Sequence, residues 1–125
     1  MRQILVVDDN ASVLKATTKC LERHFADARI NAATTGDDAI VLIEANEYDV
    51  VVSDVEMPDM NGFALQDQVR SIPGRAQLAE KFIFHTGGAS SREIDEKLQK
   101  ARFIIRKGAL PELIAAVQTV LASHG

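Results

Sequence analysis

Short apolar runs alternate along this chain with longer segments in which apolar residues recur every three or four positions. The short runs are typical of β-strands and comprise residues 4–7, 29–33, 49–53, 82–84 and 103–105. The third run contains three consecutive valines, Val50 to Val52, without polar alternation. Such a run indicates a strand that is buried on both faces of a sheet.

The segments between these runs have the spacing of amphipathic helices. We expect helices around residues 13–25, 39–45, 65–72, 91–100 and 111–121. Ser90 and Glu93 match a capping box at the start of the fourth helix, and Pro111 suits the first turn of the fifth. Because the fourth helix has only Ile94 and Leu98 as apolar anchors, we expect it to be the most loosely held.

Five strands that alternate with five helices predict right-handed crossovers and a parallel sheet with helices on both faces. The predicted fold is therefore α/β and doubly wound, with three layers. No repeat, low-complexity stretch or linker divides the chain, so residues 1–125 are interpreted as a single domain.

Composition narrows the classes of function. Apolar residues make up 46% of the chain and charged residues 26%, which is typical of a globular protein. The formal charge of −4 argues against a nucleic-acid surface, which needs a basic face. A single cysteine, Cys20, excludes an internal disulfide, and the apolar stretch after Met1 is too short for a signal peptide or a membrane span. We expect a cytoplasmic protein that starts naturally at Met1, has no output domain after its last helix, and makes no direct contact with nucleic acid or membrane.

Polar residues that could take part in binding or catalysis follow the predicted strands. In doubly wound sheets the functional crevice lies beyond the carboxyl ends of the strands, where the strand order reverses, here between the first and third strands. Asp8 and Asp9 follow the first strand, and Asp54 follows the third. Thr86 and Lys107 follow the fourth and fifth strands. We therefore expect three carboxylates, one hydroxyl and one amine on the same rim.

Three carboxylates in one crevice repel each other, so they take up protons or recruit a cation. Carboxylate oxygens suit Mg²⁺, which keeps several waters and leaves room for a phosphate oxygen. A neighbouring carboxylate can then attack phosphorus. Lysine can pair with phosphate, and a threonine hydroxyl can donate a hydrogen bond to it. Each residue alone is typical of a solvated loop or a helix cap, but their joint placement favours a phosphoaspartate site.

The motifs that carry these residues resemble a known family. They are the segment 4–10 with its acidic pair, the apolar run into Asp54, the stretch Asp-x-x-Met-Pro-x-Met-x-Gly from Asp54 to Gly62, and Thr86 and Lys107. Over essentially its whole length, the chain resembles the receiver domain of two-component response regulators. The resemblance implies a flavodoxin-like three-layer sandwich with strand order 2-1-3-4-5.

The resemblance also implies a function. Asp54 would accept a phosphoryl group from a histidine kinase or a histidine phosphotransfer protein, forming an acyl phosphate. Asp9 would bind Mg²⁺ directly and Asp8 mainly through water, while Asp54 and the backbone carbonyl of Glu56 would complete the ligands.

Other residues would act on the bound phosphoryl group. Lys107 would contact it, and Thr86 would move toward it, which changes a surface built on the fourth helix, fifth strand and fifth helix that binds a downstream protein. Glu56 and Gly88 would flank the attacking water and set the rate of dephosphorylation. The domain would not be an enzyme, apart from its own phosphorylation and dephosphorylation.

Two positions depart from the family pattern. Gly108 stands where proline usually follows the active-site lysine, so we expect a more flexible loop. Ile104 stands where the family often has an aromatic switch residue. We therefore do not predict an aromatic ring that rotates together with Thr86.

Three alternatives remain open. An aspartate-nucleophile phosphohydrolase uses similar metal chemistry, but it needs a substrate cap and an Asp-x-Asp arrangement where this chain has Asp8-Asp9-Asn10. A flavin mononucleotide binder needs phosphate donors in a loop that here presents two carboxylates. The departures at Gly108 and Ile104 permit a receiver-like scaffold without phosphotransfer.

Overall fold

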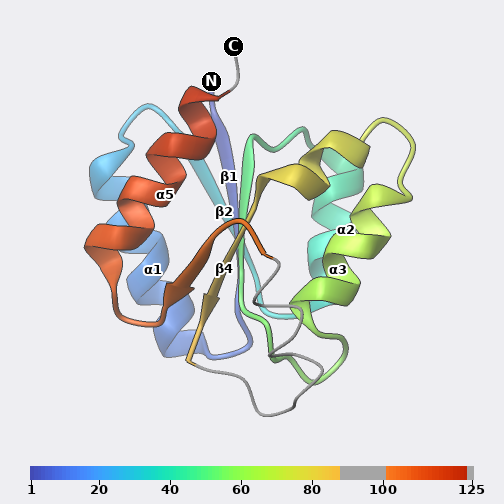
Figure 1. Ribbon diagram of the computed structural model, residues 1–125, viewed down its shortest axis with the longest axis horizontal. Helices are drawn as coiled ribbons and strands as arrows, with labels where there is room; N and C mark the ends of the chain where they lie inside the picture. The colour runs from blue at the N-terminus through green and yellow to red at the C-terminus, as the bar shows by residue number, and fades with distance from the viewer. Residues whose placement is uncertain (88–100, 124–125) are drawn as a thin grey trace.

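The computed structural model describes residues 1–87 and 101–123, which contain a five-stranded sheet (Figure 1). All neighbouring strands are parallel, and their order is β2-β1-β3-β4-β5. The strands are Gln3–Val7 (β1), Arg29–Ala33 (β2), Val50–Ser53 (β3), Phe82–Thr86 (β4) and Ile104–Arg106 (β5). The predicted strand order and the doubly wound fold are confirmed.

Helices connect the first four strands, and one further described helix follows β5. They are α1 (Ala11–His24), α2 (Gly36–Ala45), α3 (Gly62–Arg70), the 3-10 helix η1 (Ala76–Lys81) and α5 (Leu110–Ala122). Four predicted helices therefore match, whereas η1 was not predicted. The fourth predicted helix, residues 91–100 with Ser90, Glu93, Ile94 and Leu98, lies outside the described residues. Among the helices that are described, none has the length and apolar character needed to cross a membrane.

The sheet lies between α1 and α5 on one side and α2 and α3 on the other (Figure 1). An apolar cluster packs against each face of the sheet. Leu5 and Val7 of β1 pack with residues of α2 and α3, whereas Ile4 and Val6 pack with residues of α1 and α5. All four residues of β3 are buried. This burial confirms the interpretation of the valine run as a central strand, because alternate side chains point to opposite faces.

Two strands extend beyond the predicted ranges at their carboxyl ends. β4 continues past its apolar run through His85 to Thr86, and β5 is shifted one residue toward the C-terminus. The reason is main-chain pairing, since Thr86 is in register with Arg106. Backbone pairing does not require apolar side chains, so the apolar pattern underestimated both strands at their carboxyl ends.

Three helices begin just beyond the carboxyl ends of strands. Asn10, Thr35 and Asn61 precede α1, α2 and α3, and each side chain accepts a hydrogen bond from the backbone N–H three residues later. Such caps satisfy donors that the first helical turn leaves free. The connections after β1 (residues 8–10) and after β3 (residues 54–61) carry the acids of the candidate site.

Candidate functional site

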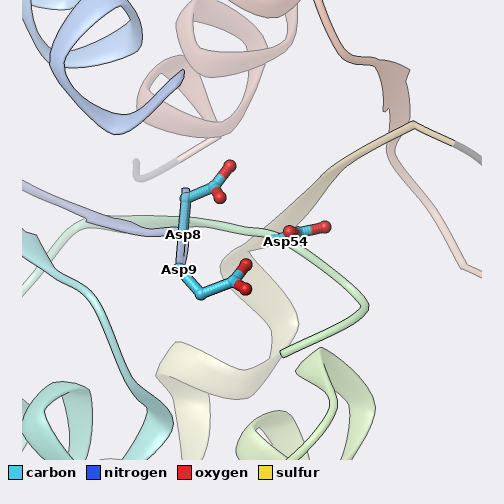
Figure 2. Close-up of side chains that lie close together, drawn as sticks. All are labelled: Asp8, Asp9 and Asp54. Atoms are coloured by element: carbon cyan, nitrogen blue, oxygen red, sulfur yellow. The ribbon is translucent and has the colours of Figure 1, made fainter. Parts of the chain in front are cut away.

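Three carboxylates converge at the carboxyl ends of β1 and β3. Figure 2 shows Asp8, Asp9 and Asp54 with their carboxyl groups pointing to the same side of the strand ends. One oxygen from each carboxylate can be chosen so that all three lie within 4.8 Å of one another. The predicted convergence of these residues is therefore observed.

Backbone pairing between the strands holds two of these acids in place. The backbone N–H of Asp54 donates to the carbonyl of Val7 at 2.8 Å, and that of Asp8 donates to the carbonyl of Ala33 at 3.1 Å. Asp8 is 2% exposed and Asp54 is 4% exposed, while Asp9 is exposed. The site thus has a buried part built by the sheet and an open part formed by Asp9.

Lys107 brings a cation to the buried acids. Its Nζ lies 2.9 Å from Oδ2 of Asp54 and 3.3 Å from Oδ2 of Asp8. Its backbone N–H donates to the carbonyl of Thr86 at 2.9 Å, which continues the pairing of β4 with β5. The amine therefore bridges carboxylates from two strands while its backbone is attached to a third.

Burial and nearby charges shift the pKa values of Asp54 and Lys107. Burial raises the pKa of the Asp54 carboxyl, and the nearby Asp8 adds to the rise, whereas the Lys107 hydrogen bond and charge oppose it. Burial would lower the pKa of the Lys107 amine, but its hydrogen bonds and charge interactions with Asp54 and Asp8 outweigh burial and raise it. The lysine is thus held in its charged form by the two carboxylates.

The donor set suits Mg²⁺. Oxygens on opposite sides of this ion are about 4.2 Å apart, because each Mg–O distance is about 2.1 Å. A spread of up to 4.8 Å among the three carboxylates therefore fits an ion bound partly through water. Three carboxylates and the Lys107 amine have a formal charge of −2 together, which one Mg²⁺ would neutralise.

The loop after Asp54, residues 55–61, is folded back onto the site. The backbone N–H of Val55 donates to Oδ1 of Asp54 at 2.8 Å, so both oxygens of this carboxylate have a partner. The backbone N–H of Gly62 donates to the carbonyl of Val55 at 2.7 Å. A Cβ atom built on Gly62 would collide with the backbone carbonyl of Asp54, so glycine is required at this close approach.

The structure describes two of the three remaining predicted residues, Thr86 and Glu56. Thr86 is the last residue of β4 and is 5% exposed. Glu56 is exposed and lies in the loop, and its predicted ligand is its backbone carbonyl rather than its carboxylate. Gly88, predicted to flank the attacking water, lies outside the described residues.

Both departures from the family pattern are exposed. Ile104 is 41% exposed, and Gly108 has a positive φ of 90°. Proline is restricted to φ near −65°. The backbone at Gly108 therefore has a conformation that the usual proline would not allow.

His85 lies beside this site but faces the core. It is 3% exposed, and no hydrogen-bond partner for its Nε2 is found among the described residues. Burial lowers the pKa of His85, and the charge of Lys107 lowers it further. Both effects favour the neutral form of the imidazole.

Comparison with known proteins identifies the family. A sequence model described as "Response regulator receiver domain" matches residues 4–118. The chain belongs to this family. The structure of a CheY-like response regulator receiver domain protein from Methanospirillum hungatei JF-1 is 26% identical, with a TM-score of 0.79 over 98% of this chain and 95% of that one.

Relatives of this receiver differ widely in size. Protein PilH of Pseudomonas aeruginosa is 29% identical over 98% of this chain and 99% of its own length. Probable histidine kinase 4 of Oryza sativa is 33% identical over 60% of this chain but only 7% of the kinase. This chain spans between 7% and 26% of the length of three such longer relatives.

One residue of the site region was not singled out in the sequence. Asp59 lies in the loop after Asp54 and is not one of the three clustered carboxylates. Its carboxylate accepts hydrogen bonds from the backbone N–H groups of Gly36 and Asp37. Its partners are more than twenty positions away in the chain. No local pattern signals such a contact, because an aspartate in a Pro-Asp turn is common for purely local reasons.

Proposed function

We propose that this receiver accepts a phosphoryl group on Asp54 in a two-component or phosphorelay pathway. The supporting observation is the convergence of the Asp8, Asp9 and Asp54 carboxylates within 4.8 Å, together with the Lys107 amine 2.9 Å from Asp54. A helix cap or a solvated loop does not require this arrangement. Phosphoryl transfer does, since it depends on positioning and on charge stabilisation.

The proposed donor is a phosphohistidine on a histidine kinase or a histidine phosphotransfer protein. A carboxylate oxygen of Asp54 attacks the phosphorus atom while the phosphorus–nitrogen bond breaks. The bonding electrons pass to the imidazole, which leaves, and the product is an acyl phosphate. The hydrogen bonds from Val55 and Lys107 orient the Asp54 carboxylate before attack.

The other site residues share the charge of the transferred group. Mg²⁺ would be bound directly by Asp9, through water by Asp8, and by Asp54 and the backbone carbonyl of Glu56. The ion would neutralise charge on the phosphoryl oxygens. Lys107 already contacts Asp54 through its amine, and it would pair with a phosphoryl oxygen after transfer.

Signal output would follow from Thr86. Its hydroxyl would donate to the phosphoryl group and shift the surface formed by the predicted fourth helix, β5 and α5, which binds a downstream protein. Water would later hydrolyse the acyl phosphate, with Glu56 and Gly88 beside its path. We propose that residues 1–125 act as a single cytoplasmic domain, with no turnover of other substrates and no direct contact with nucleic acid or membrane.

The decisive experiment measures the intact mass of the protein after incubation with Mg²⁺ and either acetyl phosphate or phosphoramidate. We expect a Mg²⁺-dependent gain of one phosphoryl group in the native chain and none in Asp54→Asn. Asp67→Asn, a change at an exposed acid of α3, serves as the control and should be phosphorylated normally. A folded native chain that binds Mg²⁺ but gains no group from either donor would contradict the proposal and favour a scaffold without phosphotransfer.

A further inference from the structure

The loop after Asp54 is attached to the start of α2 by one side chain. The carboxylate of Asp59 accepts hydrogen bonds from the backbone N–H of Gly36 at 3.2 Å and of Asp37 at 3.0 Å. These two donors lie in the first turn of α2, where N–H groups have no partner within the helix and the helix dipole favours an anion. Burial would raise the pKa of the exposed Asp59 carboxyl, but its hydrogen bonds with the backbone of Asp37 and Gly36 and of its own loop together outweigh burial and lower it.

Packing supports the same contact. The side chain of Met60 lies directly against Gly36, so closely that a Cβ atom on Gly36 would collide with it. Met60 also packs against the apolar cluster that contains residues of α2 and α3. The tip of the loop is therefore held against α2 by two neighbouring residues, one polar and one apolar.

The base of the loop is held independently. Gly62 donates its backbone N–H to the carbonyl of Val55 at 2.7 Å, and it lies against the backbone carbonyl of Asp54. Glu56 lies between this base and the tip at Asp59. The path of the backbone through Glu56 is thus determined from both sides, by Gly62 near the sheet and by Asp59 at α2.

We infer that Asp59 is a positioning residue that couples the start of α2 to the metal site by holding the loop that carries Glu56. The inference rests on the proposed function, in which the Glu56 carbonyl is a metal ligand. Partners that orient metal ligands without touching the ion commonly matter for affinity. Asp59 would have this role through the backbone, three residues from the ligand.

A purely local role for Asp59 is a weaker explanation, because α2 already has a cap. The side chain of Thr35 accepts a hydrogen bond from the backbone N–H of Asp38 at 3.0 Å. Thr35 caps α2 from the adjacent position in the chain, whereas Asp59 reaches α2 from the loop after Asp54. The two residues therefore separate capping of the helix from attachment of the loop.

The test compares Asp59→Ala, Asp59→Asn and Thr35→Ala with the native chain. Mg²⁺ is titrated while the backbone amides are followed by ¹H–¹⁵N NMR, and the phosphorylation rate with phosphoramidate is measured by intact mass. We expect Asp59→Ala to weaken Mg²⁺ binding by about three- to tenfold, at or below the lower end of the loss seen when partners of metal ligands are removed. Phosphorylation at subsaturating Mg²⁺ should slow by the same factor, and saturating Mg²⁺ should restore it.

The other variants complete the comparison. Asp59→Asn keeps one acceptor oxygen and should recover part of the Mg²⁺ affinity. Thr35→Ala should lower the melting temperature without changing the Mg²⁺ dissociation constant. In the native chain the Gly36 and Asp37 amides should shift with the same midpoint as the Asp54 amide, and this response should disappear in Asp59→Ala.

Equal Mg²⁺ dissociation constants for the native chain, Asp59→Ala and Thr35→Ala would overturn the inference and leave the phosphoacceptor role intact. Equal losses in Asp59→Ala and Thr35→Ala would also overturn it, since the effect would then come from the stability of α2. A native chain that neither binds Mg²⁺ nor becomes phosphorylated would overturn the proposed function, and this inference with it.

Discussion

Two loops meet at the candidate site, and they are held in place by different forces. The loop after Asp54 is attached to the sheet through Gly62 and to α2 through Asp59. At the loop between β5 and α5, no atom of the described residues would come within 4 Å of a Cβ on Gly108. The side chain of Lys107, which begins this second loop, is held by its ion pairs with Asp54 and Asp8.

This difference separates two requirements of phosphoryl transfer. An attacking carboxylate needs a fixed direction, which packing and backbone hydrogen bonds provide. A lysine that pairs first with a carboxylate and then with a phosphoryl oxygen must move, and an open loop with a glycine permits that movement. Packing and backbone hydrogen bonds thus position the Asp54 carboxylate, whereas charge interactions position the Lys107 amine.

The largest effect is expected at the packed loop, from Gly62→Ala. The added methyl group would collide with the Asp54 carbonyl, so the backbone must move. We expect unfolding in urea to show a loss of about 3 kcal/mol, because overpacking against the backbone outweighs the better helix propensity of alanine. An unchanged unfolding midpoint would show that this loop is not tightly packed.

The next effect is expected from Lys107→Met without Mg²⁺. This change leaves the nearly buried Asp8 and Asp54 carboxylates without their cation, and we expect a loss of about 2 kcal/mol. Added Mg²⁺ should stabilise the variant more than the native chain, because it supplies the missing positive charge. Thermal unfolding with and without Mg²⁺ measures both effects.

The control for this prediction is Lys15→Met, at an exposed position of α1. It should change neither the melting temperature nor the response to Mg²⁺. If Lys107→Met behaved in the same way, the lysine would not be held by the charge of the two acids.

A smaller effect is expected at the open loop, from Gly108→Ala. Gly108 has φ of 90° and Gly74, in the turn after α3, has φ of 81°, with open space around both among the described residues. Alanine at either site should cost about 1 kcal/mol through backbone strain alone. Because only Gly108 is next to Lys107, only Gly108→Ala should also change the phosphorylation rate with phosphoramidate. Equal rates in the two variants would mean that the loop does not limit the lysine.

The smallest effect is expected from Asp59→Asn, on the stability of the fold at acidic pH. Hydrogen bonds with the backbone of α2 and of its own loop outweigh burial and lower the folded-state pKa of Asp59, so its charged form stabilises the fold above the unfolded pKa of about 4. That contribution, about 0.5 kcal/mol for an exposed anion at a helix N-terminus, is lost as the pH falls through the lower folded pKa. The free energy of unfolding, measured with urea between neutral and acidic pH, should depend less on pH for Asp59→Asn than for the native chain. Identical pH profiles would contradict this assignment.

Much of the fold follows from local patterns. The apolar spacing in Ile4 to Val7 and in Val50 to Val52 predicts strands because side chains alternate across a sheet. Parallel strands align their carboxyl ends, so acids that follow two adjacent strands converge. That is why the neighbourhood of Asp8, Asp9 and Asp54 could be predicted before any distance was known.

Other features have no local signal. The six residues of the 3-10 helix η1 include three polar ones and show no helical period, and its Leu78 and Ala79 are buried because they pack into the core. β4 extends through His85 and Thr86 because β5 pairs with it. Local periodicity does not report such pairing.

The sequence by itself determined the order of the five strands and of α1, α2, α3 and α5 along the chain, the burial of the central strand, and the set of acids at the sheet's carboxyl edge. These features depend on neighbours in the chain and on the geometry common to all parallel sheets. Only the tertiary structure decided that Lys107 bridges Asp54 and Asp8, and that Asp59 joins the loop to α2. Such contacts join residues that are distant in the chain, and they form only after packing has brought whole elements together.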